Sequence, residues 1–161
     1  MQDKKTKMTY LKILNKKEKS EIEKNLNEQF GIESVEGLII KRGEERLFLY
    51  KGDFSEEEIK KLSLTVPIER LGIYFAKIVS SDVKLSMEGT YALKEQIKKN
   101  IFEIDKTQLE DWMKGHDLQI KTGKHQFLVM KYQNDFLGCG KASEEKIGNF
   151  IPKSRRLREK G

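Results

Sequence analysis

The stretch from residue 127 to residue 158 constrains the fold of this chain more than any other segment. Two apolar runs, Phe127–Tyr132 and residues 136–139, flank the polar triplet Gln133-Asn134-Asp135. Strand-forming residues on both sides of a short polar break predict a β-hairpin. Glycines follow at positions 138, 140 and 148. Glycine within a strand pattern indicates a bulge or the close approach of another part of the chain.

Ile151-Pro152 is predicted to end this β module, because proline has no N–H to donate to a strand ladder. The cationic run 153–158 then follows, with three arginines within four residues. A guanidinium group binds phosphate oxygens through two parallel hydrogen bonds and stacks on bases. The alternative is a disordered C-terminus whose charge serves only solubility.

The excess positive charge of the chain lies in the same region. The chain has 32 Lys and Arg against 26 Asp and Glu, a net charge of +6. Residues 121–161 carry ten basic and four acidic residues, whereas residues 1–120 carry 22 of each. A basic surface confined to one module suits a phosphate backbone.

Composition limits the class and the compartment. With 37% apolar and 36% charged residues, the chain is expected to form small cores with heavily charged surfaces. It has no run of 18 apolar residues and no secretory signal at its N-terminus, so we expect no membrane partner. One cysteine excludes an internal disulfide and favours a cytoplasmic location.

The first part of the chain predicts an α+β unit. Asn15 and Glu18 have capping-box spacing and open an amphipathic helix that ends at Gly31. Residues 37–42 and 46–51 predict a hairpin, and Ser55 opens a second helix. Pro67 is the predicted joint, which gives a first domain over residues 1–66 and a second over residues 67–161.

The second domain is expected to contain further strands and helices before the hairpin. Its predicted elements are a strand over 71–79, a helix capped by Ser86, a strand over 101–104, and a helix over 108–114. Thr107 and Glu110 have the spacing of a capping box for the last helix, and Gly115 terminates it.

These residues resemble a PUA domain, a small β pseudo-barrel found on RNA-modifying enzymes. The resemblance rests on Leu109-x-x-Trp112-Met113-x-Gly115-x-Asp117 and on Phe136-Leu137-Gly138-Cys139-Gly140-Lys141-Ala142. With Asn149-x-x-Pro152-Lys153-x-x-Arg156, residues 71–157 are most similar to the PUA-like domain of Sun-type RNA cytosine-5 methyltransferases. Two departures from that branch are Cys139 between two glycines and Ile151 where an aromatic residue is common.

The resemblance implies a fold class of α+β: an N-terminal α+β unit followed by a C-terminal PUA-like β pseudo-barrel. It also implies binding of structured RNA, tRNA or rRNA. The chain has no G-x-G-x-x-G loop after a strand and no P-loop, so we expect a stand-alone relative without the methyltransferase domain, with no cofactor and no enzymatic activity.

The predicted RNA-binding residues surround the short helix, the hairpin and the tail. They are Lys114, Gly115, Lys121, Lys124, Tyr132, Lys141, Lys153, Arg155, Arg156 and Arg158. Each lysine has the plain alternative of a solvated surface charge. For Gly115 the alternatives are a helix end and a site where the RNA backbone passes, and both can hold.

Other residues with chemical potential have simpler explanations. Cys139 is expected to be a small side chain between two glycines, because no local signature provides a base or an oxyanion site. His116, His125 and Cys139 have no spacing that would form a zinc site, so no metal is predicted. Trp112 is expected in the core, whereas Phe136, Phe150 and Tyr132 are left open between packing and stacking on RNA.

The function favoured by the sequence is non-catalytic binding of structured RNA, as an accessory factor in RNA modification or ribosome biogenesis. The mechanism would be recognition of backbone and groove shape with little reading of bases. The alternative is a protein-interaction adaptor, in which the neutral N-terminal unit docks an RNA-modifying enzyme or a ribosomal protein.

Overall fold

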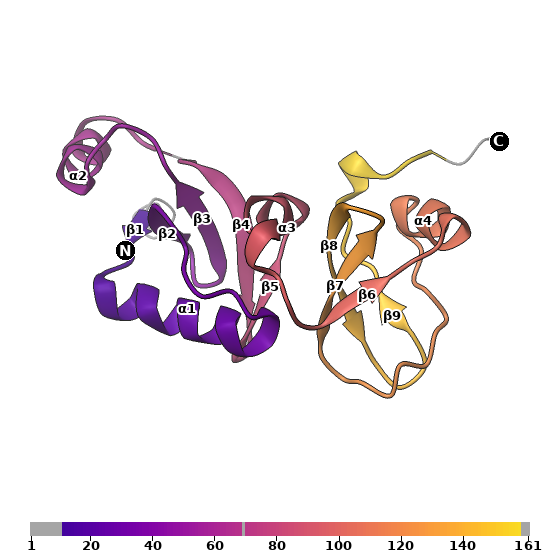
Figure 1. Ribbon diagram of the computed structural model, residues 1–161. Coiled ribbons are helices and arrows are strands. Elements are labelled where there is room, and N and C mark those ends of the chain that lie inside the picture. Colours follow the sequence, from indigo (N-terminus) through magenta and orange to yellow (C-terminus); the bar gives the residue numbers. More distant parts are fainter. Residues whose placement is uncertain (1–10, 69, 159–161) are drawn as a thin grey trace, which may run out of the picture.

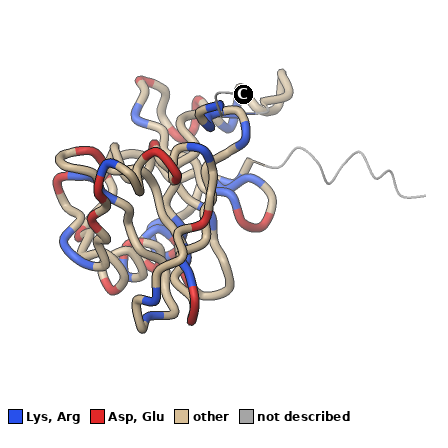
Figure 2. Tube along the Cα trace, turned by 90° about the vertical axis from the view of Figure 1, so that its right-hand side faces the viewer, with Lys and Arg blue, Asp and Glu red and all other residues tan. Residues whose placement is uncertain are grey.

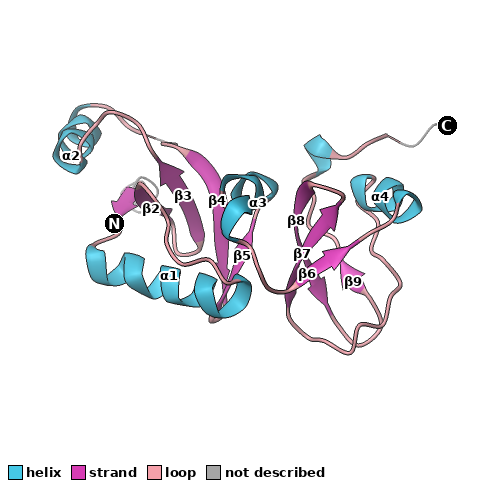
Figure 3. Ribbon diagram, viewed as in Figure 1, coloured by secondary structure: helices cyan, strands magenta, loops and turns pink. Residues whose placement is uncertain are grey.

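The computed structural model describes residues 11–68 and 70–158 and confirms the α+β class. Two sheets stand next to each other, with the short helix α3 (Met87–Ala92) between them (Figure 1). Figure 3 shows helix α1 (Lys16–Phe30) along one face of the first sheet and α4 (Lys106–Met113) beside the second. Residues 1–10, 69 and 159–161 lie outside the described residues.

The first sheet is antiparallel and follows chain order. Its strands are β1 (Leu11–Ile13), β2 (Leu38–Arg42), β3 (Arg46–Tyr50), β4 (Ile73–Val79) and β5 (Asp82–Leu85). The predicted hairpin is confirmed as β2 and β3, with Ile40 opposite Phe48. Helix α1 places Ile22, Leu26 and Phe30 in the core beneath the sheet, as their helical spacing predicts.

The predicted helix caps in this part of the chain are confirmed. The Asn15 side chain accepts the Glu18 N–H at 2.8 Å, and the Glu18 carboxylate accepts the Asn15 N–H at 3.1 Å. Gly31 ends α1 in the left-handed conformation, with φ of 77°. Ser55 caps α2 (Glu56–Thr65), as predicted.

A bulge in β4 decides which side chains share a face of the first sheet. Leu47 lies opposite Ala76, but the next residue of β3, Phe48, lies opposite Tyr74, so Phe75 is an extra residue. Cross-strand partners point to the same face. Leu47 and Ala76 face the core with α1, and Tyr74 therefore shares the opposite face with Lys77.

The second sheet contains β6 (Ile101–Glu103), β7 (Phe127–Tyr132), β8 (Asp135–Ala142) and β9 (Ile147–Gly148) in that order. β6 and β7 are parallel, and the other pairs are antiparallel. The predicted hairpin is β7 and β8, but its turn is the pair Gln133-Asn134, because Asp135 already pairs with Tyr132. Gly138 has φ of 78° at a register shift, which confirms the predicted bulge.

Helix α4 begins two residues earlier than predicted. Asp105, not Thr107, is the N-cap: its carboxylate accepts the Gln108 N–H at 2.8 Å, and the Gln108 side chain accepts the Asp105 N–H. Asp-x-x-Gln and Thr-x-x-Glu have the same capping spacing, so the sequence offered two overlapping starts. Ile104, which lies between β6 and α4, packs into the same core as Trp112.

The division between the sheets does not coincide with the predicted boundary at residue 67. β4 and β5 pair with the first sheet, although the sequence analysis placed residues 71–79 in the second domain and predicted no β5. The two sheets are separated by the stretch from residue 86 to residue 100. The division of the chain into two domains, residues 1–66 and 67–161, stays a prediction.

Helix α3 packs tightly against both sheets. A Cβ at Gly89 would lie 2.0 Å from the Phe75 carbonyl oxygen of β4, so this position admits only glycine. On the other side, the Gly138 N–H of β8 donates to the Thr90 hydroxyl at 3.1 Å, and Thr90 is fully buried. Phe127, Val129 and Cys139 of the second sheet extend the core of the first, so the two parts share this core, whereas Trp112 and Ile147 belong to a second core.

The bond between Thr90 and Gly138 provides a test of this junction. Thr90→Val keeps the shape of the side chain but leaves the buried Gly138 N–H without its acceptor, which costs about 1–3 kcal/mol of unfolding free energy. Thr90→Ser keeps the hydroxyl and serves as the control. Chemical denaturation measures both. Equal stability of the two variants would show that the hydrogen bond contributes nothing to the junction.

Candidate RNA-binding surface

The C-terminal segment packs against the end of helix α4 over its described length. Residues Lys153–Arg155 form a short 3-10 turn, and the Leu157 N–H donates to the Met113 carbonyl at 2.8 Å. The Arg156 Nε donates to the Ile151 carbonyl at 2.9 Å. The tail is therefore packed against the end of α4 as far as Leu157, and Arg155 and Arg156 are held by contacts with other residues.

Gly115 ends α4 as predicted, with φ of 88° and its N–H donating to the Trp112 carbonyl at 3.0 Å. The group that approaches it closely is the Arg156 side chain. A Cβ at position 115 would lie 2.3 Å from Arg156 Nε and 2.4 Å from its Cδ. The missing side chain thus makes room for Arg156, and contact of Gly115 with RNA stays a prediction.

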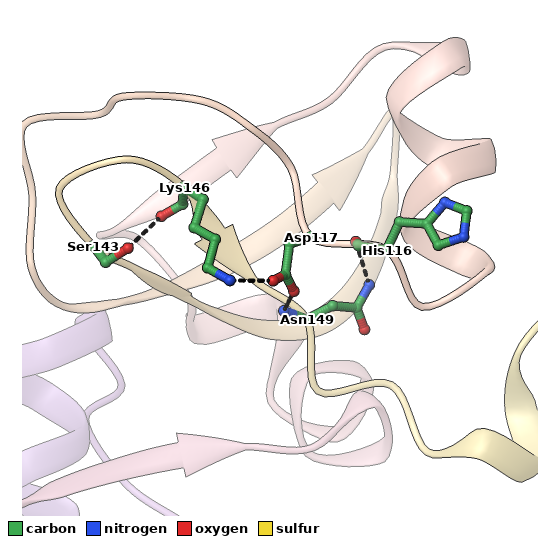
Figure 4. Close-up of polar contacts among 5 residues, drawn as sticks. All are labelled: His116, Asp117, Ser143, Lys146 and Asn149. Atoms are coloured by element: carbon green, nitrogen blue, oxygen red, sulfur yellow. Dashed lines mark hydrogen bonds and ion pairs between the residues drawn. The ribbon is translucent and has the colours of Figure 1, made fainter.

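Asn149 connects the tail to the loop after α4. Its side-chain Nδ2 donates to the carbonyls of Trp112, at 2.8 Å, and His116, at 3.0 Å. Its backbone N–H donates to Asp117 Oδ1 at 2.8 Å, and Lys146 Nζ lies 2.6 Å from Asp117 Oδ2 (Figure 4). Asn149, Pro152 and Arg156 of the sequence motif therefore lie where the tail turns back onto α4.

The predicted lysines do not form one cluster. Lys121 pairs with Glu145 at 3.4 Å, and it lies with Lys124 in the connection from α4 to β7, which runs down the second sheet away from the tail. Lys141 lies over the Phe127 ring, with Nζ 4.5 Å from its centroid. Lys114 is half-buried at the end of α4. Figure 2 shows lysine and arginine segments gathered close to the C-terminal end.

The aromatic residues divide between core and surface. Trp112 is fully buried, as predicted, and its ring fills the space above Gly140, where a Cβ would lie 2.8 Å from the indole. Tyr132 and Phe136 are half-buried and pack against the two cores. Phe150 is 43% exposed and is the best placed of the predicted aromatics to meet a ligand.

Cys139 is buried in the shared core, and burial raises the pKa of its thiol to about 12. Because the thiolate is the nucleophilic form, this cysteine is inert at neutral pH. The described residues contain no group of His, Cys, Asp and Glu side chains arranged to hold a metal ion. None of the described helices is long and apolar enough to cross a membrane.

A cationic groove of about 480 Å³, which was not predicted from the sequence, lies between the two sheets. It is lined by the exposed face of β3 to β5, the start of α3, β8 and the tail; its charged residues are Arg46, Arg70, Lys77, Lys84, Glu88 and Arg155. The neutral charge balance of residues 1–120 concealed it. The available signal was a lysine between two apolar residues in each of two neighbouring segments, Ala76-Lys77-Ile78 and Val83-Lys84-Leu85, which places each lysine on the face opposite its apolar neighbours if both segments are strands.

The contact between Gly115 and Arg156 predicts a specific coupling. Gly115→Ala forces Arg156 out of its place and adds about 1–2 kcal/mol of left-handed backbone strain. In an Arg156→Ala background, the same substitution keeps only the strain, so it is expected to destabilise less. Denaturation of the four proteins measures the difference. An equal cost in both backgrounds would show that Arg156 is not held against Gly115.

The Asp117 network predicts a pH dependence. The hydrogen bond from Lys146, and then that from the Asn149 N–H, lower the pKa of Asp117 below its ordinary value of 3.8. Its stabilising contribution is therefore complete above the unfolded-state pKa and is lost as the pH falls through the lower folded-state pKa. We expect wild-type stability to decrease below about pH 4, and Asp117→Asn to decrease less steeply there. Denaturation at a series of pH values tests this; parallel profiles would contradict it.

The comparisons with known proteins agree with this geometry. The sequence model of the family described as "Methyltransferase RsmF PUA domain" matches residues 99–157. The chain is 27% identical over 146 residues to the Ribosomal RNA small subunit methyltransferase F of Vibrio parahaemolyticus, covering 86% of the chain and 29% of that protein. It is 23% identical over 138 residues to the protein of the same name from Vibrio cholerae, covering 85% of the chain and 28% of the relative.

The chain thus spans less than a third of the length of these relatives. The matched segment begins just before β6 and ends within the tail that packs on α4. It contains the whole second sheet, the Gly115 turn and the Asn149 and Arg156 contacts. Residues 99–157 therefore resemble a PUA domain of the RsmF methyltransferase type, with the second sheet and α4 in the place of its pseudo-barrel.

Proposed function

We propose that this chain binds structured RNA through its PUA domain and the adjoining C-terminal segment. The observation that carries this proposal is the match of residues 99–157 to a PUA domain of an RNA methyltransferase. The same part of the chain carries the excess positive charge: residues 121–161 contain ten basic and four acidic residues. The name of the relatives, a small-subunit ribosomal RNA methyltransferase, favours rRNA over tRNA as the ligand.

The exposed cations of the tail suit phosphate binding. Lys153 and Arg158 are exposed, and neither forms an ion pair with another described residue. Arg155 is paired with Glu88, and Arg156 is held against Gly115 and Ile151. Arg156 therefore has a structural role that the sequence analysis did not foresee, and Lys153, Arg155 and Arg158 are the better candidates for direct contact.

We propose that the role of this segment in RNA modification or ribosome biogenesis is recognition and not chemistry. The buried Cys139 thiol, with its pKa near 12, does not supply a nucleophile. Recruitment of RNA by a small basic domain positions the substrate for an active site elsewhere, which needs affinity and orientation but no catalytic group. The cytoplasm, where rRNA is modified, is the proposed location.

A protein-interaction role for the first part of the chain is the second candidate. It is favoured by exposed apolar side chains on and around α2: Phe54, Leu62, Leu64 and Val66 are 50%, 40%, 87% and 46% exposed. Neighbouring exposed apolar side chains are typical of contact surfaces between proteins. An RNA-modifying enzyme or a ribosomal protein is the proposed partner, beside the RNA-binding role of the second part.

RNA binding is tested by titrating a folded small-subunit rRNA fragment and bulk tRNA with the wild-type chain over a range of salt concentrations. The double variant Lys153→Ala, Arg158→Ala removes two cations that hold no part of the fold. We expect weaker binding and a slope of log affinity against log salt that falls by roughly 1.4–1.8. The matched control is Lys17→Ala, Lys24→Ala on α1, which removes the same charge from exposed positions.

The proposal is overturned if the wild-type chain binds neither RNA. The assignment of the tail is wrong if the tail variant and the α1 control have the same affinity and salt slope. Thermal melts of both variants ensure that the comparison is between folded proteins.

A further inference from the structure

The cationic groove between the two sheets has the chemistry of a nucleic-acid site, and about half of its lining residues lie outside residues 99–157. Arg46, Lys77 and Lys84 extend from the face of the first sheet that is opposite α1, where the β4 bulge brings Tyr74 beside Lys77. Arg155 of the tail closes the groove from the other side. Glu88 is the single acidic residue among its described lining residues.

Lys84 is a poorly solvated cation in this groove. It is half-buried, and burial, followed by the charge of Lys77, lowers the pKa of its ammonium group. None of the described acidic residues forms an ion pair with it; its Nζ lies instead over the Phe150 ring, 4.1 Å from the centroid. An anion in the groove would restore the interactions that burial removes from this ammonium group.

Aromatic rings stand next to these cations. Phe150 is 43% exposed, and its ring is tilted by 58° against that of Phe127, with 6.1 Å between the ring centroids. Tyr74 is half-buried and packs against Phe48, at 5.7 Å. Grooves that combine cations for phosphates with rings for bases are typical of single-stranded nucleic-acid binding. A volume of about 480 Å³ accommodates a ligand the size of a nucleotide but not a duplex.

We propose that this groove binds an unpaired segment of RNA, with phosphates at Lys77, Lys84 and Arg155 and a base against Phe150 or Tyr74. The inference rests on the proposed RNA-binding function and extends it, because it makes the first sheet part of the RNA site. The ion pair of Arg155 with Glu88 holds the arginine beside the groove in the free protein. A phosphate then replaces the Glu88 carboxylate as the partner of Arg155.

The test uses a short fluorescein-labelled RNA oligonucleotide, free or annealed to its complement, and the folded rRNA fragment. Lys77→Gln, Lys84→Gln is compared with Lys17→Gln, Lys24→Gln, which removes the same charge from α1. We expect the groove variant to bind the single strand roughly tenfold more weakly near 0.1 M salt, with a salt slope lower by about 1.4. The control variant and the duplex are expected to show little change.

Two further variants sharpen the result. Glu88→Gln removes the acidic residue from the groove and frees Arg155, so single-strand binding is expected to become severalfold tighter, whereas Glu28→Gln on α1 leaves it unchanged. Phe150→Leu keeps an apolar side chain but removes the ring, and it is expected to weaken single-strand binding severalfold without changing the salt slope, since no charge is lost.

The outcomes separate this inference from the proposed function. If the wild-type chain binds the folded fragment but groove and control variants bind the single strand equally, the groove is not the site and RNA binding stands. If the wild-type chain binds neither RNA, the proposed function fails as well. Polyglutamate is titrated as a further ligand. If the groove variant binds polyglutamate more weakly than the wild type but binds RNA equally well, the groove is a site for an acidic polypeptide and the inference is overturned.

Discussion

The arrangement of the two sheets depends on how closely helix α3 packs between them. Gly89 brings the helix backbone against the Phe75 carbonyl at a distance that no side chain permits, and Thr90 accepts a hydrogen bond from Gly138 within the shared core. Packed interiors resist even small displacements. This contact therefore sets the position of the first sheet relative to the PUA domain, and with it the groove between them.

The residues that resemble the PUA motif prove to be mainly structural. Gly115 makes room for Arg156, Gly140 for the Trp112 ring, and Asn149 ties the tail to the end of α4. The type of residue at these positions is restricted, because the packing and the hydrogen bonds there leave no room for another side chain. This holds whether or not the residue also contacts a ligand. The surface proposed to bind RNA consists of what these contacts hold in place: the exposed tail cations, Phe150 and the groove.

The fold, and not the order of residues in the sequence, decides where the charged side chains gather on the surface of this protein. Residues 1–120 are neutral in sum, yet the strand pairing gathers Arg46, Lys77 and Lys84 on one face and leaves many acidic residues on the helices. The bulge at Phe75 is decisive, because without it Tyr74 and Lys77 would point to opposite faces. A phosphate backbone responds to such local concentrations of charge more than to a net value.

The sequence by itself determined the local elements: the Asn15 and Ser55 caps, the α1 stripe, both hairpins and the Gly138 bulge all follow from interactions within a few residues. Its motifs also determined the PUA resemblance. The tertiary structure alone decided that β4 joins the first sheet, that the Arg156 side chain lies against Gly115, and that Lys84 and Arg155 line the same groove. These depend on contacts between residues far apart in the chain, whose register and distance no local pattern specifies.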